Sequence, residues 1–362
     1  YYDYNNKIPS FVSSRKVAYD GRLSTTATLE SEGYSVTRLN FDGDVRITPK
    51  GPAALTLGYG RYTDQRTHRI FEKTVDNVMR VKVDTLSTGV ISVRGVYEHA
   101  QRRGEGFDVN VLLRATEQPG MRHSDVADRD RDRFTLIASF MPVTNWALNV
   151  SSAVGRDDYL ASEFGLRDNN HDVYSIGIDG TPSDKVGLGV SYSYEDYRAL
   201  SRSRQANPGV QFTDPSRNWA TDSADKVHSL IANAEFKNLA EKVDLAFSWD
   251  YNRTRATYEY ITGAVTDRTL PEEAIVPSTL PTPVALPPVK SDLWRGTVDA
   301  VYNINSRIAI GVTYWYDKYD VEDFTLDSQA QSTLTAGNNM LLYYTYAPYT
   351  AHTTWGRLMF RW

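Results

Sequence analysis

The sequence predicts an all-β protein: a transmembrane, antiparallel, up-and-down β-barrel of the kind found in the outer membrane of Gram-negative bacteria. Three observations predict this fold. Polar and apolar residues alternate over long segments, short turns alternate with long polar loops, and the chain ends on an aromatic residue. About 14 strands can be traced from this alternation. We interpret residues 1–362 as a single barrel, or as the C-terminal portion of a larger one.

The alternation has a period of two residues, which is the period of a β-strand. In residues 243–252 the odd positions are Val, Leu, Phe, Trp and Tyr, and the even positions are Asp, Ala, Ser, Asp and Asn. Residues 186–195 and 308–317 show the same pattern. Because successive side chains of a strand point to opposite faces, each segment has one apolar face and one polar face.

The strands and their connections follow from this pattern. Strands are predicted at 34–48, 52–64, 71–85, 89–103, 131–142, 145–157, 170–181, 185–198, 224–238, 242–258, 290–303, 306–320 and 350–362, with residues 1–6 as the tail of one more. The longest loops lie near 104–130, 199–223, 259–289 and 321–349. Outer-membrane barrels have short turns on the periplasmic side, so we expect these loops to be extracellular.

A soluble β-sandwich or propeller would also alternate, but its strands would be shorter. Soluble strands usually have about 5–6 residues, whereas a tilted strand needs about 9–11 to cross a bilayer, and the predicted strands reach or exceed that length. No segment approaches the roughly 18 uninterrupted apolar residues of a membrane helix, and the mean hydropathy is −0.47. The net charge of −5, with acids and bases mixed along the chain, argues against a nucleic-acid-binding surface.

The two ends of the sequence carry further predictions. Leu358, Phe360 and Trp362 are apolar residues at every second position and end the chain on an aromatic side chain, as outer-membrane proteins commonly do. We interpret them as a signal for the barrel-assembly machinery; an ordinary last strand is the alternative. Residues 1–6 are too short to span, so we expect either an N-terminal portion before them or a stub strand, and favour the former.

The sequence contains no recognisable catalytic or metal-binding motif, and we expect no enzyme, although a barrel hydrolase is a third alternative. The six histidines lack H-x-x-H spacing, and the absence of cysteine rules out a thiolate metal site or C-x-x-C-H haem attachment in this chain. The segment 125–133 is interpreted as a solvated loop with paired charges rather than a calcium loop. The proline-rich segment 271–289 is a hypothetical docking site for an external partner.

Charged residues on the polar faces of the strands are candidates for lining the lumen. Their simplest interpretation is the wetting of a pore, and a functional one is contact with a plug protein. Their mixed sign argues against a strongly ion-selective pore. The candidates are Arg38, Asp42, Asp44, Arg46, Arg80, Lys82, Arg94, Asp244, Asp250, Arg295, Asp299, Arg357 and Arg361.

Three segments carry a resemblance to a known family. Residues 2–7 (YDYNNK), residues 315–324 (WYDKYDVEDF) and the last strand, 355–362, together resemble the MtrB/PioB family of decahaem-cytochrome-associated outer-membrane barrels. The resemblance covers the whole chain and corresponds to the C-terminal half of the larger family members. Some members carry a cysteine pair near the amino terminus, and this sequence has none to compare.

The resemblance implies a function. Such a barrel is a sheath in the outer membrane that houses a periplasmic multihaem cytochrome, while an outer-surface cytochrome docks on the external loops. Haem would then belong to the partner cytochrome, and this chain would bind no cofactor. The alternative is a general or substrate-specific porin, which would purify colourless and conduct ions.

Overall fold

The computed structural model describes most of the barrel wall. The described residues are 1–5, 33–85, 89–114, 117–159, 162–204, 214–262, 280, 285–324 and 348–360, together with the backbone of four two-residue strands between 12 and 30. Much of the predicted loops 199–223, 259–289 and 321–349, and the terminal Arg361 and Trp362, therefore lie outside the described residues.

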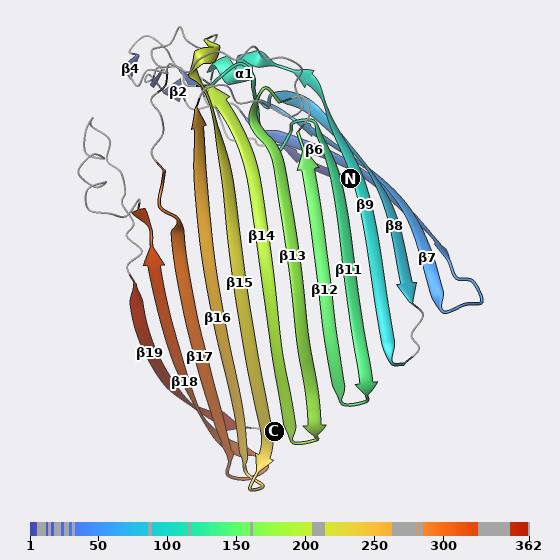
Figure 1. Ribbon diagram of the computed structural model, residues 1–362, viewed down its shortest axis with the longest axis vertical. Helices are drawn as coiled ribbons and strands as arrows, with labels where there is room; N and C mark the ends of the chain where they lie inside the picture. The colour runs from blue at the N-terminus through green and yellow to red at the C-terminus, as the bar shows by residue number, and fades with distance from the viewer. Residues whose placement is uncertain are drawn as a thin grey trace.

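The main element is a single curved sheet of antiparallel strands (Figure 1). Its strands pair in chain order, each with the one before and the one after it, which is the up-and-down topology predicted from the sequence. Fourteen strands form the path: β1 (Tyr2–Asn5), β6 (Ser35–Ile47), β7 (Ala53–Arg66), β8 (Phe71–Thr85), β9 (Ile91–Phe107), β11 (Arg129–Val143), β12 (Trp146–Asp158), β13 (Phe164–Ser183), β14 (Val186–Arg204), β15 (Asn218–Leu239), β16 (Val243–Thr262), β17 (Val289–Asn303), β18 (Ile308–Glu322) and β19 (Tyr349–Phe360).

The sheet is open within the described part of the chain. Strands β1 and β19 are the two ends of the path, and no pairing joins them among the residues described. Strand β1 covers only the first four residues of β6, from Ser35 to Arg38. Two short hairpin pairs, β2 (Val12–Ser13) with β5 (Leu29–Glu30) and β3 (Lys16–Val17) with β4 (Leu23–Ser24), lie in the connection between β1 and β6.

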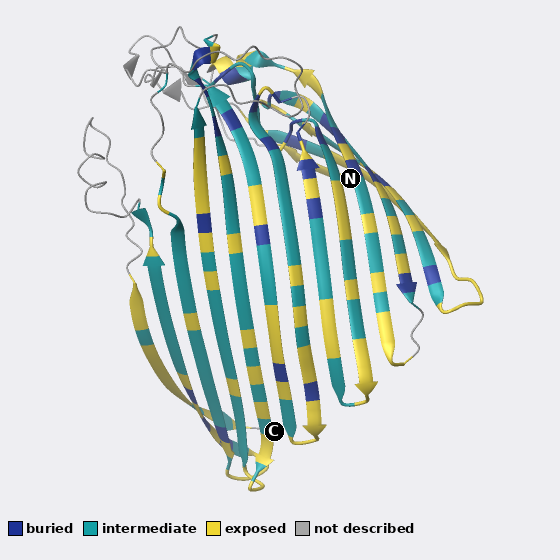
Figure 2. Cartoon of the chain, viewed as in Figure 1, coloured by how far each residue is buried: buried dark blue, intermediate teal, exposed yellow. Residues whose placement is uncertain are grey.

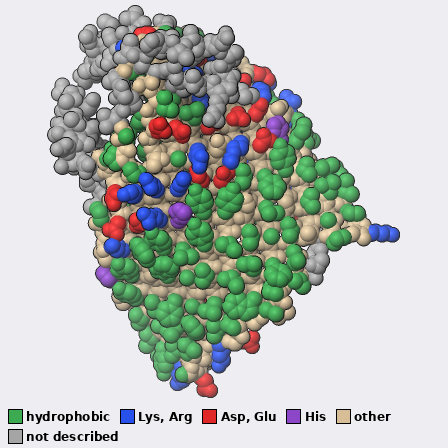
Figure 3. Space-filling view, viewed as in Figure 1, with side chains coloured by type: hydrophobic (Ala, Val, Ile, Leu, Met, Phe, Trp, Pro, Cys, Tyr) green, Lys and Arg blue, Asp and Glu red, His purple; other side chains and the backbone are tan. Residues whose placement is uncertain are grey.

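The two faces of the sheet differ as the alternation predicts. On β14, the large apolar side chains of Leu188, Val190 and Tyr192 are exposed on the face that we call the outer face. The intervening Gly189 and Ser191 belong to the opposite, inner face. Figure 3 shows hydrophobic side chains gathered in a broad band over the outer face. Such a large apolar surface needs lipid rather than water against it.

Very little of the wall is buried between protein layers. Most positions along the strands are exposed or half-buried, and fully buried positions are scarce (Figure 2). A small apolar core is formed by Ile70, Leu112 and Val126, beside the ends of β8 and β9 that carry the long loops. The folding of this sheet therefore depends on its membrane environment and its strand pairing more than on an internal core.

The strand boundaries agree with the predicted ones at the short turns and differ at the opposite ends. Strands β13 to β16 have 20, 19, 22 and 20 residues, so each extends further than predicted at the end that carries the long loops. The predicted loop 199–223 is correspondingly shorter, because residues up to Arg204 and from Asn218 onward pair with each other. Polar residues on both faces hide the alternation in these extensions.

The predicted loop 104–130 is also more ordered than expected. Strand β9 continues to Phe107 and β11 begins at Arg129; between them lie helix α1 (Val109–Arg114) and strand β10 (Met121–Arg122), which pairs in parallel with β13. The Arg122 guanidinium lies 3.9 Å from the centre of the Phe107 ring, and burial lowers the pKa of Arg122.

The interpretation of 125–133 as a solvated loop is wrong in one respect. Its charges are paired, but Val126 and Ala127 are fully buried and Arg129 is only 8% exposed. Residues from Arg129 onward belong to strand β11. Among the described residues, no helix has the length and apolar character needed to cross a membrane.

The assignment of the faces predicts how the wall tolerates charge. Replacing Val190, in the apolar band of β14, with Arg should destabilise the barrel by about 2–4 kcal/mol, because a guanidinium would face hydrocarbon. Replacing its neighbour Ser191 with Arg, on the inner face, should cost much less. Urea unfolding of both variants in lipid vesicles measures the difference. Equal losses of stability would show that the faces are wrongly assigned.

Candidate functional site

The inner face of the sheet is the candidate functional surface, and the structure places the predicted charged residues on it. By strand register, the candidates from Arg38 to Arg357 all lie on the face opposite the apolar band. Arg361 lies outside the described residues. Because the described sheet is open, the lining of a closed lumen by these residues stays a prediction.

On the first strands, the inner charges form ion pairs with each other. The Arg80 guanidinium lies 2.5 Å from the Asp42 carboxylate, which also accepts a hydrogen bond from the Tyr62 hydroxyl. Arg94 and Lys82 both contact Asp84, at 2.6 and 3.2 Å. These contacts join side chains within one strand or from adjacent or next-nearest strands, so the charges are neutralised within the wall itself.

Asp44, Arg46 and Arg38 complete the charged surface of β6. Arg38 pairs with Asp64 at 3.2 Å. Asp44 lies over Gly58 of β7, where a Cβ atom would come within 2.1 Å of a carboxylate oxygen, so glycine leaves the space that this side chain fills. Arg46 lines a shallow pocket together with Asp84 and Arg94.

The middle of the inner face carries a row of short, uncharged side chains. Ser151, Ser175, Ser193 and Ser229 are direct register partners on the four adjacent strands β12 to β15. The hydroxyls of Ser151 and Ser175 lie 2.6 Å apart. We call these four residues the serine row. Because serine is short and polar, a partner could approach the backbone closely along this row.

Charged residues reappear on the last strands, again in pairs. Arg295 contacts Asp317 at 2.9 Å, and its guanidinium lies 5.0 Å from the ring of Trp315. Arg357 contacts Asp299 at 2.6 Å, and Asp299 also accepts a hydrogen bond from the Thr313 hydroxyl. The serine row is thus flanked on both sides by ion-paired charges.

The two remaining aspartates of the predicted set have different surroundings. Asp244 lies beside a short turn, where its carboxylate accepts hydrogen bonds from the Asn238 backbone N–H at 2.7 Å and from the Asn303 side chain at 3.1 Å. Asp250 is the register partner of Arg295. Asp244 therefore has a local structural role in holding the turn.

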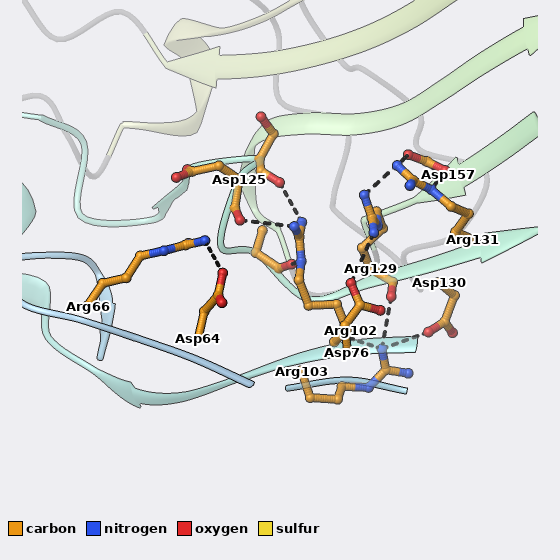
Figure 4. A network of polar contacts seen from close by, with 12 residues as sticks. Asp64, Arg66, Asp76, Arg102, Arg103, Asp125, Arg129, Asp130, Arg131 and Asp157 are labelled. Atoms are coloured by element: carbon orange, nitrogen blue, oxygen red, sulfur yellow. Dashed lines mark hydrogen bonds and ion pairs between the residues drawn. The ribbon is translucent and has the colours of Figure 1, made fainter. Parts of the chain in front are cut away.

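The strongest charged cluster was not predicted from the sequence. Near the outer ends of β8 to β12, Asp157 forms two hydrogen bonds with Arg131, at 2.6 and 2.5 Å, and lies 3.6 Å from Arg129, which also contacts Asp76 at 3.3 Å (Figure 4). Asp157 is 3% exposed. The alternation of residues 129–133 could have indicated this cluster. When the period of two residues is continued into this segment, Arg129 and Arg131 lie on the inner face and Asp130 lies on the outer face.

Arg102 connects this cluster to the segment between β9 and β11. Its guanidinium donates hydrogen bonds to the backbone carbonyls of Ser124, Asp125 and Ala127, at 2.5, 2.9 and 2.8 Å. Since Arg102 belongs to the inner face by register with Asp76, these bonds hold the segment across the inner side of the wall at its outer end. The segment therefore narrows the space enclosed by this part of the sheet.

The proposed assembly signal is placed in part. Leu358 and Phe360 lie on the outer face of β19 and are 57% and 59% exposed, and Trp362 lies outside the described residues.

Among the residues described, no group of three or more His, Cys, Asp and Glu side chains could hold a metal ion. The surface is suited to contact with water or with another protein.

Comparisons with known proteins agree with the fold. A family model described as "Putative outer membrane beta-barrel porin, MtrB/PioB" matches residues 1–362. No curated protein matches the chain.

Solved structures similar to this chain include two uptake or import receptors and a transporter. They are the ferric yersiniabactin uptake receptor FyuA of Yersinia pestis (12% identity, 80% of this chain, 52% of that chain, TM-score 0.43), the ferric-catecholate import receptor Fiu of E. coli K12 (11%, 88%, 56%, 0.47) and the copper transporter OprC (9%, 86%, 56%, 0.34). The chain spans about half the length of each.

The cluster around Asp157 gives a prediction about stability. Replacing Asp157 with Ala should destabilise the protein by about 3–5 kcal/mol, because two largely buried guanidinium groups would lose their carboxylate. Replacing the adjacent, exposed Asp158 with Ala should change stability by less than about 0.5 kcal/mol. Urea unfolding in vesicles, together with protease cleavage between residues 108 and 128, tests both. Identical behaviour of the two variants would contradict this account of the cluster.

Proposed function

This chain belongs to the MtrB/PioB family of outer-membrane β-barrels, and from this membership we propose that it forms the wall of a sheath around a multihaem c-type cytochrome. In this proposal a periplasmic cytochrome occupies the barrel, and its haem chain carries electrons across the outer membrane. The barrel itself performs no chemical step. It supplies a lipid-facing exterior, a backbone hydrogen-bonded from strand to strand and a polar inner surface.

The observation that carries the proposal is the pairing of the inner-face charges. Asp42 with Arg80 and Asp299 with Arg357 are neutralised within the wall, and the serine row between them has short, uncharged side chains. A wall that packs against a folded protein needs this combination, because an unpaired charge buried at the interface would cost free energy. A conducting pore selective for one ion sign would instead present an excess of the opposite charge.

The partners follow from the orientation of the barrel. Barrels of this class carry short turns in the periplasm and longer loops outside, so the end with the turns near Asn145 and Asn238 would face the periplasm. The cytochrome would enter there, and an outer-surface cytochrome would contact the opposite, loop-bearing end. The barrel-assembly machinery and membrane lipid are the other expected partners. Haem would stay with the cytochrome, because this sequence contains no cysteine for its covalent attachment.

A porin is the second candidate function, and the description of the family as a porin favours it. In this alternative, water and solutes would fill the space in front of the serine row. The two functions differ in whether a protein occupies the inner face.

The haem content of the purified complex distinguishes the two. The whole protein, extracted gently from its native membrane, should co-purify with a haem-staining polypeptide in a fixed ratio. A porin should purify colourless and conduct ions after reconstitution into a planar bilayer. A colourless, conducting preparation would reject the sheath.

The serine row gives a more specific prediction. Replacing Ser175 and Ser193 together with Trp should put two bulky rings on this row and lower the ratio of haem to barrel severalfold, because the cytochrome could no longer approach the wall. Replacing Tyr174, on the outer face beside them, with Trp is the matched control and should leave the ratio unchanged. Heat-modifiable migration on gels verifies that each variant is folded. An unchanged haem ratio in the folded double variant would exclude contact at the serine row.

A further inference from the structure

The outer face carries charged side chains beyond its apolar band, at the end with the long loops (Figure 3). Most of them form ion pairs with a neighbour on the same face, such as Arg156 with Asp172 at 2.6 Å and Lys290 with Glu322 at 2.7 Å. One group departs from this pattern. Arg198 of β14, Lys226 of β15 and Arg255 of β16 lie next to each other on adjacent strands, and we call them the outer basic cluster.

Two members of this cluster face each other, and the acid beside Lys226, Asp196, is shared with Arg198. Lys226 and Arg255 are direct register partners, and within the described part of the chain neither forms an ion pair. The nearest carboxylate on the strand beside Lys226 belongs to Asp196, and Arg198 already contacts both of its oxygens at 3.0 Å. Like charges directly opposite each other destabilise a sheet. An anion placed between them would remove this cost.

The cluster borders a hollow in the outer surface. A pocket of about 520 Å³ is lined by Arg198, Lys226 and Arg255, together with Thr257. The Arg198 side chain is 60% exposed, so its guanidinium remains accessible from outside although it contacts Asp196. Asp222 and Glu259 also line the pocket, but they lie four residues from Lys226 and Arg255 along their strands, which is about 13 Å. The end of the hollow nearest the apolar band is therefore its basic end.

The position of the cluster relative to the membrane follows from the aromatic side chains beside it. His228 lies two residues from Lys226 on the same face, accepts or donates a hydrogen bond with the Tyr192 hydroxyl at 2.7 Å and contacts the Tyr194 ring. On the neighbouring strands the rings of Tyr251 and Trp294 lie 4.3 Å apart. Tyr and Trp gather at the level of lipid headgroups. By strand register, Lys226 lies about 7 Å beyond Tyr194 and about 13 Å beyond Tyr251 and Trp294.

We propose that the outer basic cluster binds a phosphate group on the headgroup of an outer-leaflet glycolipid. The guanidinium groups of Arg198 and Arg255 can each donate paired hydrogen bonds to phosphate oxygens, and the Lys226 ammonium adds a point charge between them. The acyl chains of the same lipid would lie along the apolar band below. The site rests on the orientation of the barrel proposed above, in which the long loops are outside the cell.

Lipid binding to the detergent-solubilised whole protein tests this inference. Native mass spectrometry during titration with phosphorylated lipid A gives the affinity for the natural sequence and for the K226Q/R255Q double variant. The affinity of the double variant for phosphorylated lipid A should be lower by about tenfold or more, because two charge-assisted contacts with phosphate are lost. The charge-preserving variant K226R/R255K should keep most of the affinity.

A matched control and two competing ligands give the test its specificity. The K73Q/R103Q variant removes two basic residues of the same face that already contact carboxylates, Glu105 and Asp130, and its affinity should be unchanged. Removing the phosphate groups from lipid A should lower its affinity for the natural protein as much as the K226Q/R255Q substitutions lower the affinity for phosphorylated lipid A. Inorganic phosphate at comparable concentration should not displace the lipid; if it does, the site takes a free anion and the inference is wrong.

Two further outcomes would also overturn the inference. They are an undiminished affinity of a K226Q/R255Q variant that migrates as a folded barrel, and an equal loss of affinity in K73Q/R103Q. The ratio of co-purified haem should be the same in all of these variants, so the result for the lipid site is independent of the result for the sheath.

Discussion

The fold depends on one constraint: a backbone that crosses hydrocarbon must find all its hydrogen-bond partners in protein. Between the two ends of the path, β1 and β19, this chain meets it by pairing each long strand with the strands before and after it in the sequence. The same constraint explains why the strands are long and why the sheet needs so little internal core. Because neighbouring strands supply the backbone hydrogen bonds, each side chain needs only to suit the medium on its own face. Val190 and Ser191, adjacent in the chain, face media that differ as much as lipid and water do.

This division explains how much of the fold the sequence predicts. The alternation that adapts each strand to two media is local, so the 14 strands and their short turns can be located residue by residue, and the inner position of Arg80 or Asp299 follows from its phase. The signal fades where both faces are polar. Between Phe164 and Asn170 of β13, and beyond Arg198 of β14, the strands continue outside the apolar band with no difference between faces to reveal them.

The contacts that could not be predicted are those between segments far apart in the chain. The core of Ile70, Leu112 and Val126 joins three segments whose local patterns contain no periodic signal. The same applies to Arg102, which binds carbonyls more than twenty residues later in the chain. Asp157 lies in a strand located correctly, but its role depends on two arginines of the neighbouring strand. The position of a residue in the alternation predicts which face its side chain lies on. It does not predict which residue that side chain contacts.

The pairing of charges differs between the two faces, and the difference points to different partners. On the inner face Asp42, Asp84 and Asp299 each contact a basic side chain, so the charge at these three positions is neutralised within the wall. On the outer face, just beyond the aromatic residues, Lys226 and Arg255 oppose each other, and the acid beside Lys226, Asp196, is shared with Arg198. A protein in contact with the wall is best matched by charges that are already paired. A layer of anionic headgroups, in contrast, supplies further negative charge, so this excess of basic side chains is best tolerated at the level where the membrane places that layer.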